Sequence, residues 1–327
     1  MDQPLLDIRN LHVGFKIFRG FSDVLDGVDF QVWPGERVGL VGEMGCGKTT
    51  TMKAIMKLLD EPPAVITGGE ILFHNKNILK MRKKQLQELR KKRISMIFQD
   101  PMASLNPVFT IGNQLSDVIK YSKGFKGNWG FNKYIEEVIN VLNKVSLPDP
   151  NRIIHNYPIQ LSGGMRQRIS ISMALVSSSE LLIADEPGTA LDVTIKDQVL
   201  KLLDTLTKKM GSSFILISHA LGAVKNITDR TYVMYAGSMV ETAKTEDLFH
   251  NPKHPYSIGL INSTPKLSGE GVGEGIPGRI PDYYNPPKGC RFNPRCSQVM
   301  DLCKKEKPKF FKYNNQHYVA CYLYKDI

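Results

Sequence analysis

The sequence has little cysteine, little tryptophan and no long hydrophobic run. Its 327 residues include 5 cysteines and 2 tryptophans. No apolar stretch approaches the roughly 20 residues that a helix needs to cross a bilayer. The start, MDQPLLDIRN, lacks the basic and apolar regions of a signal peptide. We therefore expect a cytosolic protein without membrane-spanning segments.

The sequence also lacks an internal repeat and a strongly basic cluster. Lysine and arginine outnumber the acidic residues by 43 to 32, for a net charge of +11. Such a charge favours nucleic acid or an anionic membrane surface as a partner, but the basic residues are dispersed, apart from LRKKR at 89–93. We interpret them as a solvated surface and expect no nucleic acid. A hydrophobic content of 42% is enough for one large or two modest domains.

Residues 1–240 alternate short β-rich runs with helical stretches, which is typical of an α/β domain with a largely parallel sheet. The expected strands are LLDI, VDFQV, RVGLV, EILF, ISMIF, LLIAD, SFILIS and TYVMY. At about 106–170 amphipathic helical sequence such as FNKYIEEVINVLNKV replaces them, which predicts an inserted helical subdomain. Residues 241–327 form a predicted C-terminal extension, with helical pieces around TEDLFH and YSIGLI and then a linker, LSGEGVGEGIPGRIPDYYNPPKG.

A glycine-rich loop follows one of the expected strands. RVGLVGEMGCGKT contains the pattern G-x-x-x-x-G-K-S/T directly after a β run and before a helical stretch. Its glycines let successive backbone N–H groups turn toward phosphate oxygens, and the following helix adds its positive end. Lys48 would reach the β- and γ-phosphates, and Thr49 would ligate Mg²⁺. The predicted nucleotide-binding residues here are Gly42, Glu43, Met44, Gly45, Cys46, Gly47, Lys48, Thr49 and Thr50.

Two adjacent carboxylates end the apolar run LLIADEP at 181–187. Asp185, at the end of the expected strand, is placed to hold Mg²⁺ through its water shell. Glu186 is then left to orient or deprotonate an attacking water. Acidic residues after strands are common, but in combination with the glycine-rich loop they predict nucleotide hydrolysis.

The stretch LSGGMRQR at 161–168 opens a helix with a serine and two glycines. Exposed N–H groups and the Ser162 hydroxyl, next to Gly163 and Gly164, suit an anion at the helix N-terminus, although a helix cap alone would explain the serine. The stretch resembles the LSGGQ signature of the ATP-binding cassette family, with Met165 in the glutamine position. The resemblance implies an α/β P-loop NTPase cassette.

The resemblance also implies roles for residues elsewhere in the chain. In this family two cassettes pair head to tail and sandwich ATP between the P-loop of one and the signature of the other. Ser162 and Gly164 would then contact the γ-phosphate bound to the partner. The other implied residues are Gln99 in IFQDP as the Q-loop and a Mg²⁺ ligand, Ala190, Leu191 and Asp192 as the D-loop, His219 in LISHA as the switch histidine, and Phe15 as the aromatic that stacks on adenine, with Phe18 and Phe21 as rivals.

Longer stretches narrow the resemblance to the dipeptide/oligopeptide importer ATPases, and to their D-type subunit. They are FQDPMASLNPVFTIGNQ, DEPGTALDVTIKDQVLKLL, VMYAGSMVET and NPKHPYSIGLINSTP. Two positions depart from the family pattern: Gly188 stands in place of threonine and Ala220 in place of aspartate. The resemblance implies a peripheral subunit at the cytoplasmic face of the membrane. It would pair with an F-type paralogous ATPase or with itself beneath two membrane permease subunits, fed by an extracytoplasmic solute-binding protein.

Four of the five cysteines lie close to the C-terminus, in the pattern Cys290-x5-Cys296-x6-Cys303-x17-Cys321. Disulfides are disfavoured in the cytosol, and unrelated thiols need not cluster. Zinc usually takes closely spaced cysteine pairs, whereas a 4Fe-4S cluster tolerates wider spacing. GCRFNPRC also resembles the GC-x-F-x-x-RC tail of the importer family, which implies a 4Fe-4S cluster, with zinc as the alternative. We expect Arg291 and Arg295 to offset its negative charge.

The main rival function is a soluble iron–sulfur cassette ATPase that acts on ribosomes or nucleic acid. Such proteins usually carry two cassettes in one chain and place their clusters before them, unlike this sequence. A cassette without turnover is a third hypothesis, against which Glu186 argues. Replacing that glutamate is therefore an informative experiment.

Overall fold

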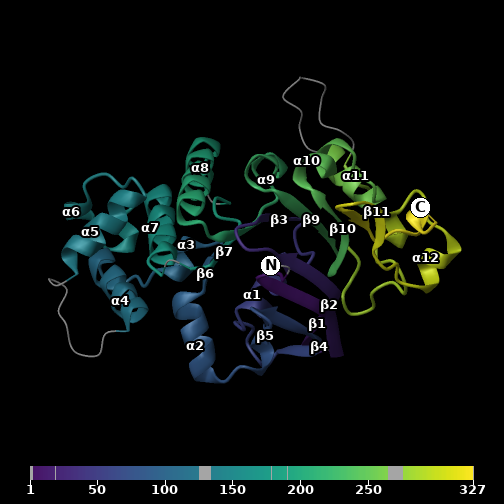
Figure 1. Cartoon of the computed structure of the whole chain (residues 1–327), viewed down its shortest axis with the longest axis horizontal. Coiled ribbons are helices and arrows are strands. Elements are labelled where there is room, and N and C mark those ends of the chain that lie inside the picture. Colours follow the sequence, from purple (N-terminus) through teal and green to yellow (C-terminus); the bar gives the residue numbers. More distant parts are fainter. Residues whose placement is uncertain are drawn as a thin grey trace. The chain divides into compact units, whose positions relative to one another are not determined.

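The computed structural model describes residues 3–18, 20–124, 134–177, 179–189, 191–263 and 275–326 (Figure 1). The chain forms two compact units, Met1–Met81 with Leu216–Ile327, and Arg82–Ile215. These units divide the chain differently from the predicted boundary at residue 240, which stays a prediction. Among the described helices, none combines the length and the apolar character that spanning a membrane requires.

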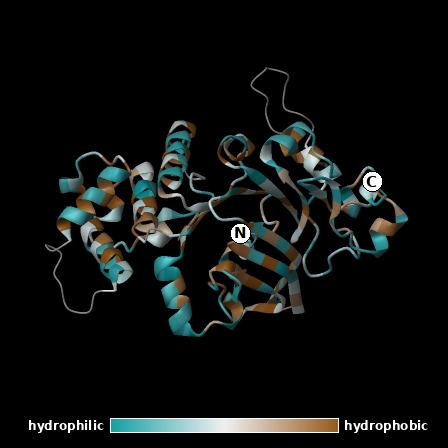
Figure 2. Ribbon diagram, viewed as in Figure 1, coloured by the Kyte–Doolittle hydropathy of each residue, from teal (hydrophilic) through white to brown (hydrophobic). Residues whose placement is uncertain are grey.

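The first unit contains an antiparallel sheet in the order β2-β1-β4-β5. The hydrophobic residues Leu6, Ile8, Leu11 and Val13 on β1 are at most 1% exposed. They alternate with polar residues except at Arg9–Asn10, where the pairing register shifts and Asn10 adopts a left-handed φ of 45°. Figure 2 shows the resulting hydropathy stripes along these strands. The strands are β1 (Leu6–Ile17), β2 (Gly20–Val32), β4 (Ala64–Phe73) and β5 (Lys76–Asn77).

Further strands of the first unit follow the order β11-β12-β10-β9-β3. Strands β3 and β9 are parallel, and the other neighbours are antiparallel. The C-terminal part of the chain therefore adds two strands beside β10. The strands are β3 (Arg37–Val41), β9 (Arg230–Tyr235), β10 (Ser238–Lys244), β11 (Phe311–Asn314) and β12 (His317–Val319). The helices are α1 (Lys48–Ile55), α9 (Leu221–Ile227), α10 (Thr245–His250), α11 (Pro255–Asn262) and α12 (Asp301–Lys305), with 3-10 turns at Ile78–Lys80, Asn293–Arg295 and Tyr322–Tyr324.

The second unit contains β6, β7 and the first three residues of β8, in the order β8-β7-β6, and β6 and β7 are parallel. All five residues of β7 are buried, as a central parallel strand requires. Between β6 and β7 the regular elements of the described residues are helical. The strands are β6 (Ile94–Ile97), β7 (Leu181–Asp185) and β8 (Ser213–Ile217); the helices are α2 (Lys83–Lys92), α3 (Pro101–Ser104), α4 (Ile111–Lys123), α5 (Ile135–Lys144), α6 (Pro150–Ile153), α7 (Gly163–Leu175) and α8 (Val193–Met210), with a 3-10 turn at Pro158–Gln160.

Every strand expected from the sequence is present, and the helical pieces TEDLFH and YSIGLI lie in α10 and α11. Strands β5, β10, β11 and β12 were not expected. Part of the predicted linker, and residues 131–133 of the predicted helix FNKYIEEV, lie outside the described residues. The described part of the linker, residues 275–289, contains no helix or strand.

Candidate nucleotide-binding site

The glycine-rich loop joins β3 to α1 in the first unit. Gly42, Gly45 and Gly47 have φ values of 153°, 81° and 107°, in the left-handed range that glycine adopts without strain. A Cβ atom at Gly42 would lie 2.2 Å from the carbonyl oxygen of Met234, so no larger residue fits there. The structure thus has the strand, tight loop and helix that phosphate binding requires.

The side chain of Lys48 folds back onto this loop. Its ammonium donates to the carbonyls of Gly42 at 2.8 Å and Glu43 at 2.9 Å, and the residue is 6% exposed. Thr49 and Thr50 follow, half-buried, in the first turn of α1, whereas Met44 is exposed. The neighbouring Cys46 is buried, and this burial raises the pKa of its thiol. Lys48 therefore already lies among the backbone groups that would surround a phosphate.

The two adjacent carboxylates lie at the end of β7 in the second unit. Asp185 is 2% exposed and Glu186 9%. Glu186 has a φ of 46°, a conformation that costs a non-glycine residue energy and is often found at functional sites. Its Oε2 accepts from the Gln99 amide at 3.1 Å and from the Thr189 hydroxyl at 2.8 Å. The structure thus joins Gln99 and Glu186, which the sequence placed in separate motifs.

The LSGG stretch caps α7 in the same unit. The Ser162 hydroxyl accepts from the N–H of Met165 at 3.3 Å. A Cβ atom at Gly164 would lie 2.8 Å from Ile195 Cγ2. At Gly163 a Cβ atom would lie 3.2 Å from Leu191 Cδ2, so the start of α7 packs closely against residues at the start of α8.

The predicted D-loop is described in part. Asp192 caps α8, and its carboxylate accepts from the N–H of Ile195 at 3.0 Å. Ala190 lies outside the described residues. Gly188 is one of the two departures from the family pattern, and it lies against the aliphatic chain of Lys196. A Cβ atom at Gly188 would lie 2.8 Å from Lys196 Cγ. Ala220 precedes α9 and provides no side-chain cap.

The predicted adenine aromatics share the β1–β2 hairpin of the first unit. Phe15 is half-buried and pairs with Ser22 and Ala64. Phe18 is fully exposed, and the ring of Phe21 lies over Gly14. Phe15 therefore stays a prediction. His219, the predicted switch residue, follows β8, belongs to the first unit and is exposed.

The C-terminal cysteines gather in one region without forming a ready metal site. None of the four forms a disulfide bond, and the N–H of Cys290 donates to the carbonyl of Cys303 at 2.8 Å. Burial raises the pKa of Cys290 to about 12 and that of Cys321 to about 11, and neighbouring cysteines add to both increases. Within the described residues, no group of three His, Cys, Asp or Glu side chains is arranged to hold a metal ion.

A buried polar network attaches the C-terminal part to β10. Glu241 is 0% exposed and accepts from the N–H groups of Lys253 at 2.7 Å and His254 at 2.8 Å, and its carboxylate lies 2.6 Å from His317 Nε2. Burial lowers the pKa of His254 to about 4, so its imidazole is neutral at pH 7, and Nδ1 accepts from the N–H of Tyr256 at 3.1 Å. We did not predict this network. A lone glutamate in the apolar run VMYAGSMVET was its only sequence signal.

A phosphate-binding loop, an acidic pair after a buried strand and a serine–glycine helix cap, on one α/β chain, define an ATP-binding cassette. The chain is 44% identical to the oligopeptide transport ATP-binding protein OppD of Bacillus subtilis, over 98% of this chain and 88% of that protein. It belongs to the ABC transporter family, whose model matches residues 25–189, and residues 240–303 match the oligopeptide/dipeptide transporter C-terminal region.

Other relatives and solved structures agree with this assignment. The dipeptide transport ATP-binding protein DppD of Bacillus subtilis is 43% identical, over 98% of this chain and 95% of its own. The OppD protein of Salmonella typhimurium is 42% identical, over 93% and 89%. The ATP-binding cassette MJ0796, in a dimeric post-hydrolysis state bound to ADP and Pi, has a TM-score of 0.65 over 73% of this chain and 98% of its own. At 23% identity, this last likeness shows the fold alone. The relatives do not favour the ribosome-associated rival function.

Proposed function

We propose that this chain binds and hydrolyses ATP to energise the import of peptides through an ABC transporter. The observation that carries the proposal is the combination of a complete phosphate-binding loop with the peptide-transporter C-terminal region at residues 240–303. Each of the relatives described above is named as an ATP-binding protein of oligopeptide or dipeptide transport. Residues 1–240, with a helical subdomain at about 106–170, form the cassette in this proposal, and residues 241–327 form the extension.

The site residues divide into binding and catalytic groups. Lys48 and the loop N–H groups bind the phosphates, and Phe15 stacks on adenine. Glu186 holds the attacking water and takes its proton, and Gln99, hydrogen-bonded to Glu186, fixes the direction of that carboxylate. His219 completes the group as the switch residue. The hydroxyl of Thr49, the amide of Gln99 and the carboxylate of Asp185 are oxygen donors of the kind that Mg²⁺ prefers, and the ion would neutralise charge on the phosphates.

The second half of each site comes from another cassette in this proposal. Ser162, Gly163 and Gly164 lie at the N-terminus of α7, where backbone N–H groups attract an anion. With Asp192, they would meet the γ-phosphate bound to the partner, which is an F-type paralogue or a second copy of this chain. Loss of that phosphate on hydrolysis lets the pair separate. The pair would lie at the cytoplasmic face of the membrane, beneath two permease subunits and an extracytoplasmic solute-binding protein.

The test of the proposed function is peptide-stimulated ATP hydrolysis. We expect the chain, reconstituted in vesicles with its permease subunits, its partner ATPase and binding protein, to hydrolyse ATP faster when a peptide is supplied outside. Stimulation by a ribosome preparation, and none by peptide, would instead support the rival function. An oligosaccharide or a nickel chelate in place of the peptide tests the other cargoes of this importer class.

The four C-terminal cysteines fit an iron–sulfur cluster in donor type and number. Four thiolates match a 4Fe-4S cluster, and the backbone N–H groups of Phe292, Gln298 and Leu323 lower the pKa values of Cys290, Cys296 and Cys321 against the effect of burial, which favours the thiolate forms. In the described residues no three of these side chains are arranged to hold a metal ion, so cluster binding would have to draw them together. In this proposal the cluster holds the C-terminal part of the chain in one conformation.

We expect protein purified without oxygen to contain about four irons and four sulfides per chain. Changing Cys296 to Ser should remove most of both, while Cys46→Ser should leave them unchanged, because Cys46 lies in the glycine-rich loop. The measurement is iron, zinc and acid-labile sulfide per polypeptide, with a visible spectrum. Zinc without sulfide would show that the alternative metal is correct, and protein without either metal would rule out a metal centre.

A further inference from the structure

Arg295, in the cysteine-containing stretch GCRFNPRC, binds a residue of the glycine-rich loop. Its guanidinium donates to both carboxylate oxygens of Glu43, at 2.9 and 3.1 Å. The Arg295 side chain is 6% exposed and that of Glu43 27%. Burial by itself would lower the pKa of Arg295, but the hydrogen bonds to Glu43 and Tyr235 raise it, so the arginine keeps its charge. Such paired, charge-assisted hydrogen bonds fix both distance and orientation.

Two tyrosines hold the same loop. The Tyr283 hydroxyl donates to the carbonyl of Gly45 at 2.7 Å, and the Tyr256 hydroxyl accepts from the N–H of Glu43 at 2.8 Å. The ring of Tyr256 lies 5.5 Å from that of Phe292, which belongs to GCRFNPRC. Contacts from Tyr256, Tyr283 and Arg295 thus reach both Glu43 and Gly45.

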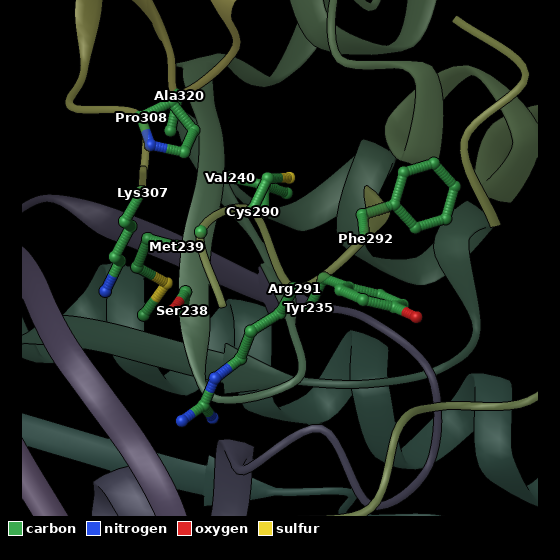
Figure 3. A pocket seen from close by; sticks show the side chains of 11 residues that line it. Tyr235, Ser238, Met239, Val240, Cys290, Arg291, Phe292, Lys307, Pro308 and Ala320 are labelled. Atoms are coloured by element: carbon green, nitrogen blue, oxygen red, sulfur yellow. The ribbon is translucent and has the colours of Figure 1, made fainter. Parts of the chain in front are cut away.

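A second route to the loop begins at Arg291. This buried residue donates to the carbonyl of Ala236 at 2.7 Å, and the next N–H, that of Gly237, donates to the carbonyl of Cys46 at 2.8 Å. Figure 3 shows Arg291 and Cys290 on the wall of a small pocket, with the guanidinium directed away from the cysteine. Our expectation that Arg291 and Arg295 offset charge on a cysteine cluster was therefore wrong, because their guanidinium groups bind Asp23 and Glu43.

The contact between Arg295 and Glu43 affects nucleotide binding because Glu43 lies in the phosphate-binding loop. A carboxylate within a phosphate-binding loop repels the phosphates, and this repulsion is strong where water is partly excluded. Arg295 compensates that charge and holds the carboxylate in one position, while Tyr283 holds the loop backbone two residues further on. The glycines that give the loop its shape also make it costly to order, so outside contacts that order it favour ligand binding.

We propose that the C-terminal module, residues 275–326, positions the glycine-rich loop for Mg·ATP, and that Arg295 is the positioning residue that transmits the state of the cysteine region to it. The inference rests on the proposed function, since it concerns the affinity of the same nucleotide site. Arg295 directly precedes Cys296, so any change that displaces this cysteine also moves the Arg295–Glu43 contact. Nucleotide affinity then depends on whether the cysteine region is intact.

The test is equilibrium binding of a fluorescent N-methylanthraniloyl-ATP with Mg²⁺ to the purified full-length chain. We expect Arg295→Gln to weaken binding by about tenfold, because it leaves Glu43 uncompensated, and the loss to be larger at low salt. Arg279→Gln is the matched control, since Arg279 lies in the same module and is exposed, and it should bind as the unaltered protein does. Binding by Arg295→Gln equal to that of the control would overturn the inference.

A double-variant cycle separates positioning from general loss of structure. We expect Glu43→Gln with Arg295→Gln to bind more tightly than Arg295→Gln alone, because the unpaired carboxylate is then gone. Losses that simply add would contradict the proposed contact. If Arg295→Gln does not fold, Glu43→Arg tests the same contact, because it places two positive charges together and so breaks the pair at its other residue. Unaltered protein that binds no Mg·ATP would instead contradict the proposed function.

Cys296→Ser tests the transmission. We expect Cys296→Ser as a single change to weaken Mg·ATP binding. Added to Arg295→Gln, it should weaken binding little further. An equal loss in both backgrounds would show that the cysteine region acts by another route, and no loss in either would show that it does not act on the loop.

Discussion

The Glu186→Gln variant is expected to bind Mg·ATP and to lose nearly all turnover, by about 100-fold or more. A glutamine has the shape of the glutamate but does not accept the proton of the attacking water. Its side-chain oxygen still accepts from Gln99 and Thr189, the two groups that contact Oε2 in the structure. Binding and fold are therefore preserved while proton transfer is lost. The measurement is phosphate release at saturating Mg·ATP, with nucleotide affinity determined in parallel.

Glu88→Gln is a suitable control for this experiment. Glu88 lies on α2 in the same unit as Glu186, and its side chain is 61% exposed in ion pairs with Lys91 and Lys92. Exposed pairs of this kind contribute little, so turnover should stay at the level of the unaltered protein. We also expect Glu186→Gln, with Mg·ATP, to remain paired in size-exclusion chromatography, because the γ-phosphate that joins two cassettes persists. Undiminished turnover in Glu186→Gln would remove Glu186 from its proposed role.

Local sequence patterns predicted most of the regular structure because strands and helices depend on short-range periodicity. The five-residue runs RVGLV, LLIAD and SFILI all became strands, and most of their residues are buried. Strands β11 and β12 were missed because they are only 4 and 3 residues long, and β11 has no buried residue. The pairing of β12 with β10 joins residues 78 positions apart, Glu241 and Val319, which no local window contains.

The candidate site was predictable where a motif fixes the backbone and unpredictable where distant residues meet. The glycine pattern indicated a tight phosphate-binding loop between a strand and a helix, and the structure has such a loop, with left-handed φ values at Gly42, Gly45 and Gly47. The Arg295–Glu43 pair joins residues 252 positions apart, and each residue taken alone reads as an ordinary surface charge. The left-handed conformation of Glu186 was also not expected, since glutamate has no intrinsic preference for it.

The C-terminal region packs more extensively than its composition suggested. A small segment poor in apolar residues usually needs a metal centre or a similar crosslink to fold. The ring of Phe292, which is 3% exposed, lies 5.0 Å from that of Tyr235 and 5.7 Å from that of His254. Pairs of aromatic rings add stability beyond their buried area. The aromatic contacts and the pairing of β12 with β10 therefore stabilise this region alongside any metal that the cysteines bind.

Glu241→Ala is expected to destabilise the protein by about 3 to 5 kcal/mol, as breaking a buried ionic or strongly hydrogen-bonded group usually does. The carboxylate is fully buried, and its removal leaves the N–H groups of Lys253 and His254 and the imidazole of His317 without their acceptor. Each unsatisfied donor away from water costs energy, and the lost side chain leaves a cavity. The measurement is the free energy of unfolding from urea titration at pH 7.

Glu246→Ala provides the matched control, because Glu246 lies five residues further on and is exposed, so its loss should change stability by less than about 0.5 kcal/mol. The stability of Glu241→Gln should lie between those of Glu241→Ala and Glu246→Ala. Its amide oxygen accepts from some of the three donors, while its NH₂ group faces another donor and does not bond with it. Because His317 belongs to β12 and Lys253 precedes α11, we also expect Glu241→Ala to expose residues 300–326 to limited proteolysis first. If Glu241→Ala were as stable as Glu246→Ala, water or another group would have to satisfy the three donors, and this network would not be what attaches the C-terminal part to β10.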